Sequence, residues 1–260
     1  MKRMLIILVL LSSRPVIAAG LDEMILWNYS FPSVSEMNYS VESFAVCSRG
    51  LKADFLHADP YRLGSLSWNF IGLAYGREKW GAFVQTRLYG LDGLYDNTDF
   101  ATGAALKLFP HMAGSIFTKF AFESFEGFGE YRSLDLGVQA TFKKGNLGAT
   151  TALNGIKLLR PYADKQARLE PMFIGSYSTA GHMVLSAGFR KSSQQRNRFM
   201  ANHDIRLTPA IGLNLGYMNN PNVLRWGLDF SWKKVRLMVT YIGMDKLNDT
   251  IVLGVSAGSI

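Results

Sequence analysis

The sequence predicts an all-β protein: a transmembrane, antiparallel, up-and-down β-barrel of about fourteen strands (twelve to fourteen) that follows a cleaved signal peptide. Three observations lead to this fold class. Apolar and polar residues alternate with period two from Leu51 almost to the C-terminus. The connections between the alternating stretches differ in length at the two ends of the predicted sheet. The chain begins with an export signal and contains a single cysteine.

The N-terminal residues are typical of a secretory signal peptide. Met1-Lys2-Arg3 is a basic start, Met4 to Leu11 is an uninterrupted apolar run, and Val16-Ile17-Ala18-Ala19 offers small residues for cleavage. The apolar run is too short to span a bilayer as a helix. We therefore expect residues 1–19 to be removed, residues 20–50 to form an N-terminal segment (a lumen plug or a first strand), and residues 51–260 to form the barrel.

The alternation is clearest between Asn222 and Ile260. There Trp226 and Phe230 belong to a bulky apolar face, whereas Arg225 and Asp229 belong to a face of small or charged residues. Trp232, beside a Lys-Lys turn, is expected in an interfacial aromatic girdle.

Similar stretches precede this one. In order, the expected strands are Leu51–Ala58; Ser65–Tyr75, with Leu66, Trp68 and Phe70 on one face and a bulge at Ile71-Gly72; Trp80–Leu88; Phe100–Phe109; Ile116–Glu123; Leu134–Lys143; Leu147–Asn154; Met172–Ser178; Met183–Arg190; Phe199–Leu207; Ile211–Tyr217; and three more in the C-terminal stretch.

The expected connections alternate between long and short along the chain. Outer-membrane barrels have short periplasmic turns and longer outer loops. A soluble β-sandwich would also show alternating strands, but it has no reason to sort its loops by length. A closed barrel also pairs every backbone polar group within lipid. The barrel is therefore favoured over the sandwich, and we expect it in the bacterial outer membrane.

Composition excludes several classes of protein. Cys47 is the only cysteine, so an intramolecular disulfide and a cysteine-based metal cluster are both excluded. Loss of Lys2, Arg3 and Arg14 leaves 28 − 3 = 25 basic and 20 acidic residues, a mild excess of +5. Nucleic acid is not an expected partner. No metal-ligand spacing or phosphate-binding loop occurs, and no cofactor is expected.

The sequence does not predict an enzyme. A lipid-acting barrel enzyme would need a histidine and a serine close together on one strand face, and none of the four histidines is followed by a serine at that spacing. His203 and Asp204 are neighbours on an expected strand and so point to opposite faces. Asp96 and Asp99 are interpreted as polar residues of the rim. No catalytic residue is assigned.

Two sets of residues are candidates for function. The minority face of the strands carries charges of both signs, which can pair across the interior. The candidate lumen-facing residues are Arg87, Lys107, Lys119, Asp135, Gln139, Arg225, Asp229 and Arg236, with Glu123, Asp204 and Arg206 on the same face. The candidate outer-loop contacts are Arg160, Tyr162, Lys165, Arg168, Arg196 and Arg198, in the longest loop and in the most basic one.

The strand rhythm from Leu207 to Gly258 resembles the last four strands of FadL-type hydrophobic-compound transporters and of PorV/PorQ-type barrels. The resemblance implies a fourteen-stranded barrel with an N-terminal segment inside it. The chain lacks the Asn-Pro-Ala signature of that group and a terminal Phe. We expect a non-enzymatic protein in contact with outer-membrane lipid, which passes a small molecule (hydrophobic ones included) or acts as a scaffold. Alternatives are a secretion or surface-assembly component with protein partners, and a lipid-acting enzyme.

Overall fold

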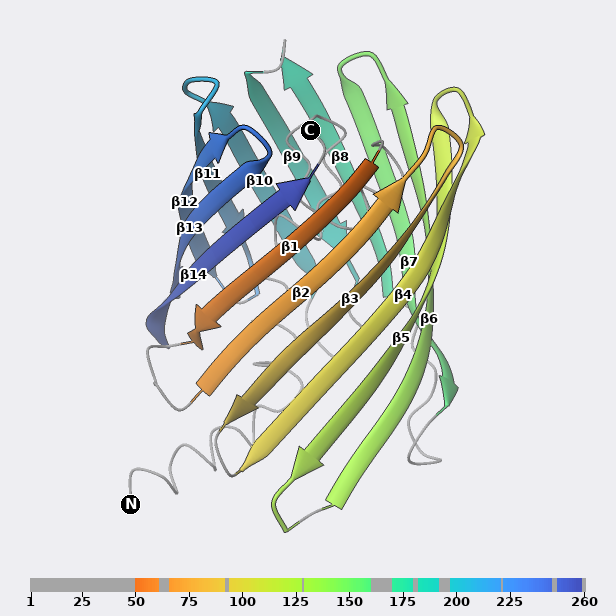
Figure 1. Ribbon diagram of the computed structural model, residues 1–260, viewed down its shortest axis with the longest axis vertical. Coiled ribbons are helices and arrows are strands. Elements are labelled where there is room, and N and C mark those ends of the chain that lie inside the picture. Colours follow the sequence, from red (N-terminus) through yellow and green to blue (C-terminus); the bar gives the residue numbers. More distant parts are fainter. Residues whose placement is uncertain are drawn as a thin grey trace.

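The computed structural model describes residues 50–60, 66–91, 94–127, 129–159, 170–179, 182–191, 197–220, 222–244 and 247–258. The predicted signal peptide and residues 20–49 lie outside this part of the chain. Fourteen antiparallel strands form one closed barrel (Figure 1). They are β1 (Gly50–Asp59), β2 (Leu66–Gly76), β3 (Trp80–Leu91), β4 (Tyr95–Phe109), β5 (Met112–Phe125), β6 (Gly129–Lys144), β7 (Leu147–Leu159), β8 (Glu170–Thr179), β9 (Met183–Arg190), β10 (Arg198–Arg206), β11 (Ile211–Met218), β12 (Val223–Trp232), β13 (Val235–Met244) and β14 (Leu247–Gly258).

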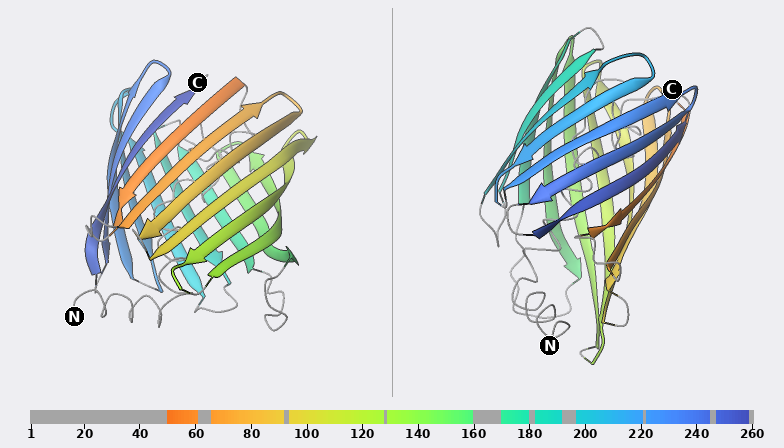
Figure 2. Two further views of the ribbon diagram at one scale, coloured as in Figure 1. Left: turned by 60° about the horizontal axis from the view of Figure 1, so that its bottom comes forward. Right: turned by 90° about the vertical axis from the view of Figure 1, so that its left-hand side faces the viewer.

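The first and last strands close the barrel. β1 pairs with β14 in a continuous antiparallel register from Lys52 opposite Gly258 to Asp59 opposite Ile251. Every other strand pairs with its two neighbours in sequence, so the ring has no free edge (Figure 2). Closure satisfies the backbone hydrogen bonds that an open sheet would leave unpaired in lipid.

Side chains on the two faces of the wall differ as the alternation predicts. On β12, Arg225 and Asp229 are buried at 5% and 7% exposure, whereas Trp226 and Phe230 are 50% and 47% exposed. Large apolar side chains are exposed on the outside of nearly every strand, and Trp232 is exposed at the end of β12. An apolar belt around a closed barrel is what lipid requires. The chain is therefore an integral β-barrel of the bacterial outer membrane.

One prediction about β2 was wrong. The register of β2 is continuous against both β1 and β3, so the strand has no bulge at Ile71-Gly72. Without a bulge the two faces cannot exchange, and Trp68 and Phe70 are buried on the interior face while Leu73 is exposed outside. Interior apolar residues from several strands form one cluster: Leu56, Trp68, Phe70, Met200, Met218, Val223, Ile242 and others.

The strict alternation of loop lengths was also wrong in detail. We call the end of the barrel that holds the β2–β3 connection and the end of β14 the turn end; the other is the loop end. Turn-end connections have two to four residues, and the three longest connections, 60–65, 160–169 and 191–197, are at the loop end. The connection between β13 and β14, however, is only residues 245–246 because both strands continue into the expected loop.

Strands β4 to β7 are the longest, with 13 to 16 residues each. They extend towards the loop end beyond the predicted bounds, which is visible at the lower end of Figure 1. Among the described residues, no helix is long and apolar enough to cross a membrane.

Candidate functional site

Three charged side chains from adjacent strands meet on the interior wall. Arg87 on β3 is opposite Asp99 on β4, and Lys119 on β5 is opposite Ala101 of β4. Lys119 Nζ lies 2.8 Å from Asp99 Oδ2, and Arg87 also forms an ion pair with this oxygen. One carboxylate therefore holds two cations from the neighbouring strands. We call these residues the first triad.

A second triad also consists of two cations and one carboxylate. Asp229 on β12 lies between Arg206 on β10 and Arg236 on β13. Arg206 Nη1 is 3.2 Å from Asp229 Oδ1, and Arg236 Nη2 is 2.5 Å from Asp229 Oδ2. Arg206 also donates a hydrogen bond of 3.2 Å to the hydroxyl of Ser231. Each carboxylate oxygen thus faces a different guanidinium, an arrangement that fixes both arginines.

The two triads lie on nearly opposite walls. Their central strands, β4 and β12, are six places apart one way round the ring and eight the other. Each triad has two cations and one carboxylate, so each adds one positive charge to the interior. The charges are of mixed sign within each wall, and these ion pairs join nearby strands of one wall rather than crossing the interior.

A network of polar side chains lies beside the second triad on the inner wall. Asp204 on β10 accepts hydrogen bonds from two amides: from Asn202 Nδ2 at 2.8 Å and from Asn214 on β11. Asn214 Nδ2 also donates to Asn202 Oδ1 at 3.2 Å. His203 lies on the other face, opposite Leu185 and Leu215 of the neighbouring strands. Its ring and the Asp204 carboxylate therefore do not pair, as the alternation predicts.

Seven of the eight candidate lumen residues are at least partly buried and occupy inward-facing positions in the alternation of their strands. They are Arg87, Lys119, Asp135, Gln139, Arg225, Asp229 and Arg236. Asp135 is opposite Lys119 in the β5–β6 register. Gln139 donates to Thr141, whose hydroxyl contacts Thr150. Their role in a channel stays a prediction.

Lys107 differs from the others. Its side chain is exposed at the turn end of β4, next to a register irregularity between Lys107 and Phe109. Because β4 ends at Phe109, close to Lys107, an inward-facing position in the alternation no longer implies a buried side chain. Lys107 belongs to the rim of the barrel rather than to its inner wall.

Among the outer-loop candidates, Arg160, Tyr162, Lys165, Arg168 and Arg196 lie outside the described residues. Arg198 is described and is placed differently from the expectation. It is the first residue of β10, its side chain is 2% exposed, and its Nε donates to the carbonyl oxygen of Asn220 at 3.0 Å. The strand begins one residue earlier than predicted, which turns Arg198 inwards.

Sequence reasoning did not select several interior polar residues, among them Asp99, Asn202 and Asn214. Asp99 was assigned to a rim loop because the strand was expected to begin at Phe100. The alternation of Asp99, Phe100 and Ala101 was the available signal. Lys52 and Asp54 on β1, whose charged groups are 3.0 Å apart, were also missed because that strand's pattern is weak.

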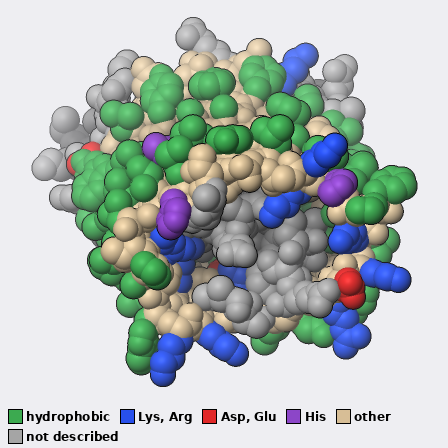
Figure 3. Space-filling model, turned by 90° about the horizontal axis from the view of Figure 1, so that it is seen from above, with side chains coloured by type: hydrophobic (Ala, Val, Ile, Leu, Met, Phe, Trp, Pro, Cys, Tyr) green, Lys and Arg blue, Asp and Glu red, His purple; other side chains and the backbone are tan. Residues whose placement is uncertain are grey.

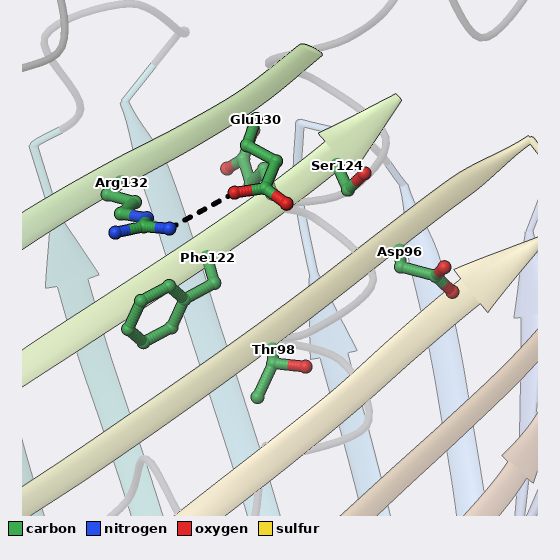
Figure 4. A pocket seen from close by; sticks show the side chains of 7 residues that line it. Asp96, Thr98, Phe122, Ser124, Glu130 and Arg132 are labelled. Atoms are coloured by element: carbon green, nitrogen blue, oxygen red, sulfur yellow. Dashed lines mark hydrogen bonds and ion pairs between the residues drawn. The ribbon is translucent and has the colours of Figure 1, made fainter. Parts of the chain in front are cut away.

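A polar hollow lies on the outside of the wall near the loop end (Figure 4). It measures about 280 Å³ and lies where outward-facing residues change from apolar to polar. Phe100 and Phe120 are opposite each other in the last apolar row, and Phe122 then lies opposite Arg132, which forms a 3.2 Å ion pair with Glu130. The hollow therefore marks where the lipid belt ends. No group of His, Cys, Asp or Glu in the described part of the chain is arranged to hold a metal ion.

Comparison with known proteins supports the fold. No family model matches the sequence, and no curated protein matches it. The outer membrane protein Omp33 of Acinetobacter baumannii aligns with a TM-score of 0.53 at 10% identity, over 80% of this chain and 97% of that one. The KdgM porin aligns with a TM-score of 0.46 at 10% identity over 80% and 99%, and a Rh. blastica porin variant with 0.44 at 8% over 81% and 98%. The chain thus has a closed β-barrel fold like that of the outer membrane protein Omp33.

Proposed function

We propose that this protein is a non-enzymatic channel that passes small molecules across the outer membrane. The observation that carries the proposal is the inner wall: two triads of two cations and one carboxylate lie on nearly opposite sides of a closed, lipid-embedded barrel. Charged side chains are costly inside a barrel that only needs packing, and they are typical of a wall that meets polar solutes.

An apolar cluster lies on the interior side of the wall. Trp68 and Phe70 on β2 are buried inside together with Met200 and Met218. These four side chains are at most 3% exposed, so they offer a solute no open apolar surface. Passage of a hydrophobic molecule, which the resemblance to FadL-type and PorV/PorQ-type barrels implies, therefore stays a prediction.

Reconstitution in planar bilayers tests the channel. We expect stepwise conductance from the folded barrel and none from a heat-unfolded sample of the same preparation. A folded barrel that neither conducts nor releases small sugars from vesicles would contradict the proposal. Removal of residues 20–49, the proposed lumen segment, provides a second conductance experiment. If that segment restricts the lumen, the shortened barrel conducts more than the full mature chain.

A role in partner binding is the second candidate. The longest connection, residues 160–169, is at the loop end, where outer loops contact other molecules. Replacing residues 160–169 with a Gly-Ser segment of equal length should leave the barrel folded and its conductance intact. Loss of a co-purifying protein in that variant alone would favour the partner role. Release of fatty acid from lipid vesicles by the wild-type barrel would instead favour a lipid-acting enzyme.

A further inference from the structure

Exposed cations lie at or beside four of the six turn-end connections of the barrel. The exposed basic side chains of the turn-end connections and the adjoining strand ends are Arg77, Lys79, Lys107, Lys143, Lys144, Lys233 and Lys234, and we call them the basic collar. Glu78 is the one acidic residue among the described residues of the turn-end connections. Figure 3 views this end and shows Lys and Arg side chains spread around the rim.

Exposed aromatic rings lie directly beside the collar on the outer surface. Trp232 ends β12 with 73% of its surface exposed, and Trp80 begins β3 with 43% exposed. Lys233 Nζ is 5.1 Å from the centre of the Trp232 ring. The Arg77 guanidinium is 5.9 Å from the centre of the Trp80 ring. The cations are thus positioned at the level of the aromatic side chains rather than extended away from the barrel.

This level is where lipid headgroups lie. Aromatic girdles of membrane barrels mark the boundary between the hydrocarbon and the polar headgroups. Cations beside that boundary attract the phosphates of anionic lipids. The described outer wall near the loop end is different, since Arg132 there is paired with Glu130 at 3.2 Å and Asp96 lies nearby. On this described part of the outer wall the charges are of both signs, whereas the basic collar contains one acidic neighbour, Glu78.

The short turns of such barrels face the periplasm, and the lipid there is phospholipid. We propose that the basic collar binds the headgroup phosphates of anionic phospholipids in the periplasmic leaflet. The collar residues lie at or beside four of the six turn-end connections, β2–β3, β4–β5, β6–β7 and β12–β13, so they contact several lipids rather than one bound molecule. This role is independent of whether the lumen conducts.

Tryptophan fluorescence tests the proposal, because Trp80 and Trp232 are part of the girdle. The folded protein is placed in vesicles that contain a small equal fraction of either brominated phosphatidylglycerol or brominated phosphatidylcholine. At low salt we expect phosphatidylglycerol to quench the fluorescence more strongly than phosphatidylcholine, which corresponds to an association preference of about fivefold or more for the anionic lipid. High salt should reduce this preference. In K143Q/K144Q/K233Q/K234Q the preference should disappear.

Two control variants separate charge from other effects. K143R/K144R/K233R/K234R keeps the charge and should keep the preference. R132Q/K191Q removes two cations from the loop end and should also keep it. Heat-modifiable migration reports folding, and the pairs K143Q/K144Q and K233Q/K234Q, each expected to lose part of the preference, replace the fourfold variant if it does not fold.

Equal quenching by the two lipids in the wild-type barrel would overturn the proposal. So would a preference that survives the fourfold glutamine variant. If that variant keeps the lipid preference but no longer sediments with purified peptidoglycan, the collar binds an acidic cell-wall polymer instead.

Discussion

Lys119 Nζ lies 2.8 Å from Asp99 Oδ2, and Arg87 on the opposite neighbouring strand pairs with the same oxygen. The Asp99 side chain is 7% exposed and that of Lys119 33%, so water screens the pair only in part. One carboxylate therefore offsets the repulsion between two cations on strands that flank it. The stability of this part of the wall depends on Asp99 more than on either cation.

Asp99→Asn should destabilise the barrel. The substitution keeps the shape of the side chain but leaves Arg87 and Lys119 as like charges without their shared carboxylate. Breaking a largely buried ion pair costs about 3 kcal/mol. Urea unfolding in lipid vesicles, followed by tryptophan fluorescence, measures the free energy of unfolding. Asp96→Asn on the exposed outer face of the same strand is the matched control, and an equal loss in both variants would contradict the role given to Asp99.

Asp229→Asn should change ion selectivity in the proposed channel. The substitution removes the carboxylate that Arg206 and Arg236 share, so the interior gains a net positive charge. The reversal potential in a salt gradient should shift towards anion permeation. Arg236→Gln should shift it in the opposite direction. Shifts of the same sign in both variants would show that these residues do not line the conducting path.

The number of strands and the faces of most of them could be predicted because lipid imposes a strict period of two on the chain. The ends of β4 to β7 could not, because beyond the lipid both faces are polar and the alternation disappears at residues such as Asp96 and Thr98. The triads could not be assembled either, since Arg206, Asp229 and Arg236 meet only through strand register. The inward position of Trp68 was not predicted. A bulge at Ile71-Gly72, which the sequence also allows, would exchange the two faces of β2 and so leave the direction of the Trp68 side chain open.

The placement of Trp68 can be tested directly. Variants that retain only Trp68 or only Trp226, with phenylalanine at the other tryptophan positions, are placed in lipid with brominated chains. Trp226 is 50% exposed on the outer face and should be strongly quenched, whereas Trp68 is fully buried inside and should not be. Strong quenching of Trp68 would mean that β2 contains the bulge after all and turns this ring to the lipid.

Gly137 lies under an aromatic ring. Phe117 on β5 is opposite both Gly103 on β4 and Gly137 on β6. A Cβ added at Gly137 would overlap the Phe117 ring, and one added at Gly103 would meet Phe83, whose ring centre is 6.3 Å from that of Phe117. The glycines therefore make room for two interior rings that cover the backbone of their neighbours.

Gly137→Ala should lower the free energy of unfolding by about 1 to 3 kcal/mol, because the Phe117 ring must leave its position to accommodate the methyl group. Gly175→Ala on β8 is the control, since a Cβ there would meet no atom within 4 Å. That variant should be neutral or slightly stabilising, because alanine has less conformational freedom in the unfolded chain. Phe117→Leu should restore part of the stability lost in Gly137→Ala. Equal stability of the two alanine variants would show that the ring does not cover Gly137.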